Sequence, residues 1–137
     1  MFSQTTEYAL RAMVCLAQTP DELAAAPTLA KQTRVPANYL AKVLQQLAAA
    51  GLITGRRGVG GGYRLAKPAE NITLLEIVLA MGTVRADGSL PEGNGPTDRC
   101  LRQLEHKLRE ATSAVTAVFR DVTLDELVAT QIQQASS

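Results

Sequence analysis

The chain has no tryptophan, two cysteines and an aromatic content of 4%, so it lacks the residues that build disulfide scaffolds and aromatic-rich grooves. It has no apolar run near the roughly 18 residues of a membrane span, and no basic-then-apolar signal segment at its start. We therefore expect a cytoplasmic protein with no membrane partner. The length of 137 residues, 46% hydrophobic and 20% charged, is typical of one globular domain with or without an accessory element.

The formal net charge of +1 is small because two halves of opposite charge cancel. Residues 1–68 hold eight Lys and Arg against three Asp and Glu, a net charge of +5; residues 69–137 hold six against ten, a net charge of −4. A solvated surface usually mixes both signs, so this segregation favours a polyanionic partner. Residues 31–67, the basic segment, contain no acid and seven bases: Lys31, Arg34, Lys42, Arg56, Arg57, Arg64 and Lys67.

Apolar spacing predicts three helices in the first half of the chain. A mostly apolar helix is expected over residues 5–18, and Pro20 ends it. A short second helix is expected after Thr28, a candidate N-cap. Pro36 suits the first turn of a third helix, which runs to about residue 50.

A glycine-rich hairpin is expected directly after the third helix. Short strands are predicted over residues 52–54 and 63–66, with the loop 55–62 between them. Three helices followed by such a hairpin predict a mainly α fold with a small β-hairpin, a winged helix-turn-helix whose wing is the loop.

The second half predicts a linker and a long helix. Thr73 and Glu76 have the spacing of a capping box that starts a helix ending near Met81, so the winged helix-turn-helix domain is expected over residues 1–81. Glycine and proline make residues 82–99 a flexible loop of the sensor type.

Residues 100–137 are expected to hold a dimerisation helix and a short C-terminal helix. A second capping-box pattern, Thr123 to Glu126, begins the short helix, and the tail 131–137 is expected to fray. The long helix carries apolar residues at 3-4 spacing, a narrow seam suited to a partner helix in a homodimer. The seam consists of Leu101, Leu104, Leu108, Ala111, Val115, Val118 and Val122.

The basic segment, placed on this frame, supplies candidate contacts with double-stranded DNA. The start of the third helix faces base edges in the major groove, where Asn can pair with adenine and Lys can reach guanine or phosphate. Glycine lets the wing approach the duplex, and Arg57 is expected to enter the minor groove. Tyr39 is either a phosphate contact or a support for the helix. The DNA-binding set is Arg34, Asn38, Tyr39, Ala41, Lys42, Arg56, Arg57, Gly60 and Arg64.

No catalytic motif occurs, so we do not expect an enzyme. The single histidine, His106, is expected at the surface, and Cys15 in the apolar first helix is expected to be an inert core thiol. Cys100 follows Arg99 at the start of the long helix, where the cation and the helix dipole favour a thiolate. Cys100 is therefore either a redox sensor or a structural residue.

Several motifs resemble the Rrf-two family of bacterial transcription regulators, the IscR- and NsrR-like proteins. The resemblance covers residues 3–128 and implies a homodimeric winged-helix regulator on a roughly palindromic operator, with DNA contacts at Asn38, Tyr39, Ala41, Lys42 and Arg57. The motifs are Glu7-Tyr8-Ala9-Leu10-Arg11-Ala12-Met13, Tyr39-Leu40, Gly51-Leu52, Arg57-Gly-Val-Gly-Gly-Gly-Tyr63-Arg64-Leu65, and Ile72-Thr73-Leu74 through Thr123-Leu124.

The chain departs from this family at the metal cluster. Cluster-binding relatives place three cysteines before the long helix, whereas this chain offers Cys100 alone there, and Gln103 stands where some relatives have a histidine ligand. A two-iron cluster needs four ligands, so we expect no iron–sulfur cofactor. The signal stays open between Cys100 oxidation, a small molecule, a partner protein, or none. The alternative function is a winged-helix module that binds an acidic protein.

Overall fold

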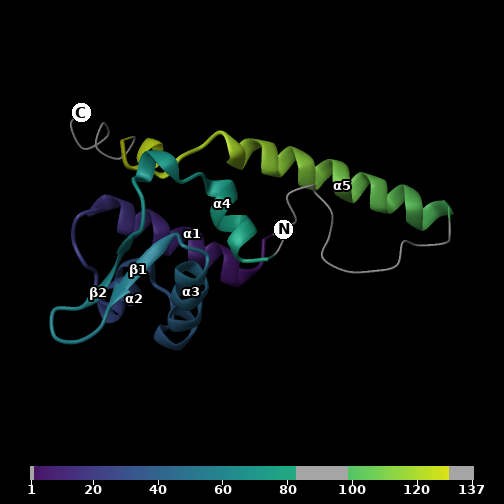
Figure 1. Ribbon diagram of the computed structural model, residues 1–137. Helices are drawn as coiled ribbons and strands as arrows, with labels where there is room; N and C mark the ends of the chain where they lie inside the picture. Colours follow the sequence, from purple (N-terminus) through teal and green to yellow (C-terminus); the bar gives the residue numbers. More distant parts are fainter. Residues whose placement is uncertain (1, 83–98, 130–137) are drawn as a thin grey trace.

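The computed structural model describes residues 2–82 and 99–129 (Figure 1). The expected linker, apart from its two end residues, and the expected frayed tail lie outside these ranges. In chain order the elements are α1 (Gln4–Gln18), α2 (Ala26–Thr33), α3 (Ala37–Ala49), β1 (Ile53–Arg56), β2 (Gly62–Leu65), the 3-10 turn η1 (Ala69–Asn71), α4 (Leu74–Ala80) and α5 (Arg99–Arg120). Residues 124–129 form one further short helix.

The arrangement is the expected winged helix with a long C-terminal helix. Helix α1 contacts α2, α3, α4 and β2, so it forms the centre of the body. Helix α5 extends past the body as an arm, while α3 and the loop between β1 and β2 lie on the opposite side (Figure 1). None of the described helices is both long and apolar enough to cross a membrane.

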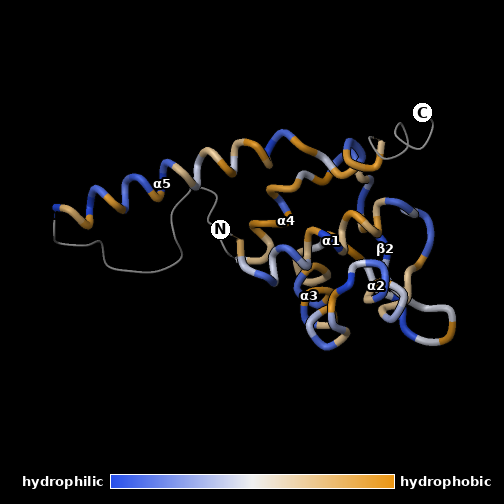
Figure 2. Tube along the Cα trace, turned by 180° about the vertical axis from the view of Figure 1, so that it is seen from behind, coloured by the Kyte–Doolittle hydropathy of each residue, from blue (hydrophilic) through white to orange (hydrophobic). Residues whose placement is uncertain are grey.

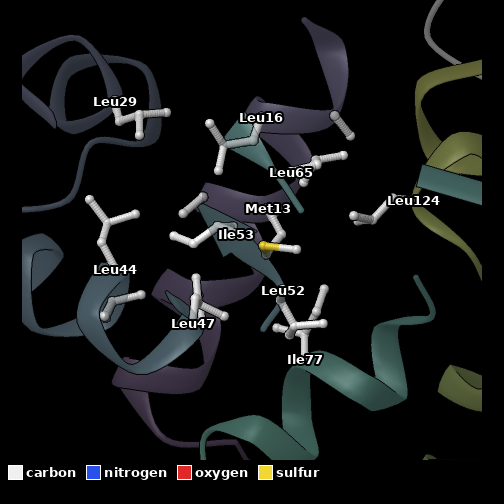
Figure 3. Packing of buried hydrophobic residues seen from close by; sticks show 14 of the residues in the cluster. Met13, Leu16, Leu29, Leu44, Leu47, Leu52, Ile53, Leu65, Ile77 and Leu124 are labelled. Atoms are coloured by element: carbon white, nitrogen blue, oxygen red, sulfur yellow. The ribbon is translucent and has the colours of Figure 1, made fainter. Parts of the chain in front are cut away.

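One apolar core joins the helices to the hairpin. Met13 of α1, Leu47 of α3 and Ile53 of β1 point toward one another and are at most 2% exposed (Figure 3). Ile77 of α4 and Leu124, near the C-terminal end, extend the same cluster. Complete burial of such a side chain is worth about 1.5–3 kcal/mol, so the core fixes the positions of α3 and the hairpin.

The start of α2 differs from the expectation. Thr28 is not the N-cap: Ala25 occupies that position, and the helix begins at Ala26 with Pro27 in its first turn. The fixed φ of proline favours helix initiation, and its missing N–H has no partner to lose there. Pro36 is the N-cap residue of α3.

Of the two hydrogen bonds of the capping box expected at the start of α4, the structure shows the one from Glu76 N–H to Thr73. The Thr73 hydroxyl accepts a hydrogen bond of 3.2 Å from the Glu76 N–H. The Glu76 carboxylate, however, binds the Lys67 ammonium at 2.7 Å instead of the start of the helix. The nearby cation competes successfully for the carboxylate, and this contact ties the end of the hairpin to α4.

The seam on α5 ends earlier than expected. Val122 lies beyond the last helical residue, and its carbonyl accepts a hydrogen bond of 2.9 Å from the Leu74 N–H. The Leu124 N–H in turn donates to the Ile72 carbonyl at 3.0 Å. Because this pairing requires extended backbone, the chain leaves the helix before Val122. The second capping threonine, Thr123, uses its hydroxyl on the Asp125 carboxylate.

Candidate DNA-binding interface

The turn between α2 and α3 is held by backbone hydrogen bonds. Arg34 ends α2 in a left-handed conformation, with φ of 59° and ψ of 36°, and its N–H donates to the Ala30 carbonyl. The Val35 N–H donates to the same carbonyl at 3.2 Å. Thr33 is buried, and its hydroxyl donates to the Leu29 carbonyl at 2.6 Å. The start of α3 is thus set rigidly against α2.

Helix α3 separates a buried face from a free one. The buried face consists of Leu40, Val43, Leu44 and Leu47, each at most 1% exposed. The candidate readers Asn38, Tyr39, Ala41 and Lys42 are all exposed, as the helical period requires of residues between the buried ones. The structure therefore brings all four to one surface at the start of α3.

Tyr8 of α1 packs against Tyr39, and Arg11 packs against Tyr8 in turn, a role of these two residues that the sequence analysis does not predict. The ring of Tyr8 meets the ring of Tyr39 edge-on, with centroids 6.4 Å apart. The Arg11 guanidinium lies 5.7 Å from the Tyr8 ring centroid and donates to the Thr33 carbonyl at 3.5 Å. The signal was the spacing of three residues between an aromatic and a cation on one helix. Tyr39 is 50% exposed, so packing against Tyr8 leaves about half of the residue accessible to a ligand.

The hairpin sorts its side chains by strand alternation. Ile53 pairs with Leu65 and both are buried, so Thr54 and its partner Arg64 occupy the outward face. Arg56, two residues from Thr54, shares that outward face with Arg64. The sequence predicts Arg56 in the loop of the wing and Arg64 in the second strand, and the register of the hairpin brings both onto one surface.

The loop of the wing turns at Gly58, whose carbonyl accepts a hydrogen bond of 3.0 Å from the Gly61 N–H. Arg57 stands immediately before this turn, whereas the fully exposed residue at its tip is Val59. Gly60 has φ of +75°, a conformation that side chains disfavour. Arg57 is therefore exposed on the strand side of the turn, and Val59 rather than Arg57 occupies the tip of the wing.

The wing is attached to the loop between α1 and α2. Ala24 and Tyr63 exchange two backbone hydrogen bonds of 2.9 Å each, an isolated antiparallel bridge beside β2. Gly62 passes so close that a Cβ there would lie 2.5 Å from the Ala24 carbonyl oxygen. A Cβ at Gly61 would likewise lie 2.2 Å from the Arg56 carbonyl oxygen. Glycine at these two positions is what allows the wing to be fixed in direction.

The charges of the basic segment are largely unneutralised. Lys67 pairs with Glu76 at 2.7 Å. Within residues 2–82 and 99–129, the other six bases of the segment have no ion-pair partner. Six exposed cations on the helix-turn-helix and wing give a positive field that attracts a polyanion.

Helix α5 carries an apolar stripe that faces solvent over much of its length. Leu101, Leu104 and Val118 are 52%, 54% and 61% exposed. The stripe is visible as alternating apolar and polar stretches along α5 (Figure 2). Near its other end the helix touches the body, where Phe119 stacks on Phe2 with ring centroids 5.2 Å apart.

The two cysteines lie in different surroundings. Cys15 is half-buried against the core, where burial raises the pKa of its thiol. Cys100 is exposed at the second residue of α5, and His106 is exposed on the same helix. Among the described residues, no group of three or more His, Cys, Asp or Glu side chains is placed to hold a metal ion.

A helix-turn-helix, a glycine-rich wing and unneutralised cations on both define a winged-helix DNA-binding protein. Comparison with known sequences identifies the family: residues 2–130 match the Rrf2 family, described as "Iron-dependent Transcriptional regulator". The chain belongs to the Rrf2 family and is a DNA-binding transcription regulator.

Individual relatives agree with this assignment. A putative HTH-type transcriptional regulator of Aquifex aeolicus is 29% identical over 93% of this chain and 91% of its own length. The putative HTH-type transcriptional regulator BadM of Rhodopseudomonas palustris is 33% identical over 91% of this chain and 79% of its own. The solved structure of CymR, the global cysteine regulator of B. subtilis, superimposes with a TM-score of 0.73 at 25% identity, covering 95% of this chain and 97% of that one. The family and these relatives are all described as regulators, and the expectation that the chain is not an enzyme agrees with those descriptions.

Proposed function

We propose that the protein acts in the bacterial cytoplasm as a homodimer that binds a palindromic promoter site. The observation that carries the proposal is the separation of two surfaces: the cationic α3 and wing on one side, and the apolar stripe of α5 on the other (Figure 1). Pairing of two α5 stripes buries leucines that otherwise face water. Dimeric helix-turn-helix proteins bind half-sites one helical turn of about 34–36 Å, or a multiple of it, apart, and we expect the same of the two α3 helices here.

Each exposed residue then has a defined task on the duplex. Asn38 and Lys42 read base edges in the major groove, and the Ala41 methyl group contacts a thymine methyl. Arg57 enters the adjacent minor groove, whose narrow form concentrates negative potential. The outward arginines of the hairpin and the backbone of Gly60 lie against the phosphates.

We further propose that regulation proceeds without an iron–sulfur cluster. The family description implies iron, but the donor set of this chain does not fit a cluster of the family type. The whole sequence has two cysteines, and Cys15 packs half-buried against the core, far along the chain from Cys100. One exposed thiol per protomer falls short of the four ligands that such a cluster requires.

For the signal, we propose oxidation of Cys100, which is exposed beside Arg99. Hydrogen peroxide would oxidise the Cys100 thiol to a sulfenic acid and be reduced to water. Treatment with peroxide should change the operator affinity of the wild type and leave that of Cys100→Ser unchanged. An equal response in both proteins contradicts this role and directs attention to a small molecule or a partner protein.

The salt dependence of binding tests the DNA interface. A duplex selected from genomic fragments is titrated with protein at several salt concentrations, with fluorescence anisotropy as the readout. Each neutralised phosphate contributes about −0.9 to the slope of log affinity against log salt. Arg57→Ala should weaken binding and flatten the slope. The matched control, Arg109→Ala, removes an arginine of α5 that pairs with Glu105 at 3.1 Å, and should leave binding unchanged. Salt-independent binding by the wild type would refute the proposal in favour of a protein partner.

A further inference from the structure

Arg34 has a backbone conformation that its side chain disfavours. Among residues 2–82 and 99–129 it is the only residue other than glycine with positive φ, at 59°. The remaining positive-φ positions are all glycines. For an L-residue the left-handed region is unfavourable because Cβ approaches the following carbonyl, whereas glycine has no such penalty. The sequence thus has an arginine where backbone geometry alone favours glycine.

The surrounding structure holds this conformation in place. The Arg34 N–H and the Val35 N–H both donate to the Ala30 carbonyl and so close the end of α2. Val35 is 3% exposed, and it precedes Pro36, which restricts its backbone to extended conformations. Relaxing Arg34 would break the two hydrogen bonds and withdraw Val35 from the core, so the unfavourable conformation persists.

The side chain gains nothing in the free protein that offsets this cost. Within the two described stretches, the exposed Arg34 guanidinium forms no hydrogen bond, ion pair or ring contact. Arg11, by contrast, uses its guanidinium on the Thr33 carbonyl and the Tyr8 ring. Strained residues of this kind occur preferentially at functional sites. The compensation for Arg34 is therefore expected from a ligand.

We infer that Arg34 trades folding stability for DNA affinity: its guanidinium binds a backbone phosphate beside the groove that α3 enters. The inference rests on the proposed function, and it defines this arginine's role in the same interface. The turn projects Arg34 from the junction of α2 and α3, two residues before Pro36, the N-cap of α3. A phosphate contact there would fix the register of α3 without reading sequence.

The trade-off predicts opposite changes for Arg34→Gly in two measurements. Glycine removes the left-handed penalty, but it also loses more conformational entropy on folding than arginine does. The net effect raises the folding equilibrium constant roughly two- to fivefold. Loss of one phosphate contact per protomer, which is two per dimer, lowers the magnitude of the salt slope by about 1.8. Each lost contact therefore makes the affinity deficit of the variant about 15-fold larger at 50 mM salt than at 1 M salt.

Two further variants separate the cation from the backbone. Arg34→Lys keeps the charge and the strain, so it should retain the salt slope and the stability of the wild type. Gly51→Arg installs an arginine at another left-handed position, with φ of +78° and no atom within 4 Å of a Cβ. Its loss of stability measures the cost of a left-handed arginine in the same protein, and it should be similar in size to the gain of Arg34→Gly.

The experiment combines urea unfolding with anisotropy titrations on a duplex that the wild-type protein selects from genomic fragments. Higher stability of Arg34→Gly together with weaker, less salt-dependent binding supports the inference. If the wild type binds DNA in a salt-dependent way, unchanged binding or lower stability of Arg34→Gly overturns the inference about Arg34. If the wild type shows no salt-dependent binding, the proposed function itself fails, and the inference fails with it.

Discussion

Substitution of Gly62 by alanine should detach the wing from the body. A Cβ at this position lies 2.5 Å from the Ala24 carbonyl oxygen and 2.6 Å from the carbonyl carbon. Restoring ordinary van der Waals contact needs a shift of about 0.9 Å, which stretches hydrogen bonds beyond useful length. The bonds at risk are the two of 2.9 Å between Ala24 and Tyr63. Their net loss costs about 2 kcal/mol, or roughly 6 °C in Tm.

The assay follows the detachment directly. Amide hydrogen exchange at Ala24 and Tyr63 should become faster in Gly62→Ala, and DNA affinity should fall about tenfold at low salt because Arg57 loses its fixed direction. Gly60→Ala is the matched control, since its φ is +75° but no atom lies within 4 Å of a Cβ. It should lose stability while the two amides stay protected. Unchanged exchange and affinity in Gly62→Ala would refute the attachment of the wing.

The remaining predictions concern the dimer, a thiol and a cap. Leu104→Glu should convert the dimer to a monomer in analytical ultracentrifugation, whereas Gln103→Glu, the neighbouring exposed residue, should not; a dimeric Leu104→Glu protein would contradict pairing through the α5 stripe. Burial raises the pKa of Cys15, so at pH 8 the folded protein has less Cys15 thiolate than the unfolded chain. In the Cys100→Ser variant, where Cys15 is the single thiol, iodoacetamide should therefore react faster after unfolding. Equal rates in the folded and unfolded protein would contradict this prediction. Thr73→Ala removes the cap of α4 and should cost about 1 kcal/mol in urea unfolding, so an unchanged midpoint would show the cap to be dispensable.

The sequence predicts most elements because their signals are local. The apolar period of α3 separates Leu40 from its exposed neighbours, and the breaker-rich loop after β1 marks the wing before any contact is known. The boundary errors are local too. At Thr28 a polar residue suggested a cap, but the proline before it starts the helix earlier.

The features that the sequence hides depend on contacts between distant residues. No local pattern shows that Glu76 binds Lys67, or that Ala24 pairs with Tyr63. The left-handed backbone of Arg34 is hidden for the same reason, because the packing of Val35 in the core helps to impose it. The basic segment predicts the positive charge of the site, whereas only the fold shows which surface its side chains occupy.

Hydroxyl-radical footprinting on the selected duplex tests the central claim most directly. A homodimer that presents two α3 helices and two wings predicts symmetric protection of two half-sites, with centres one or more helical turns of about 10.5 base pairs apart. Minor-groove protection assigned to the wings should disappear in Arg57→Ala while the symmetric pattern remains. A single asymmetric footprint, or a pattern that Arg57→Ala leaves unchanged, would contradict the account.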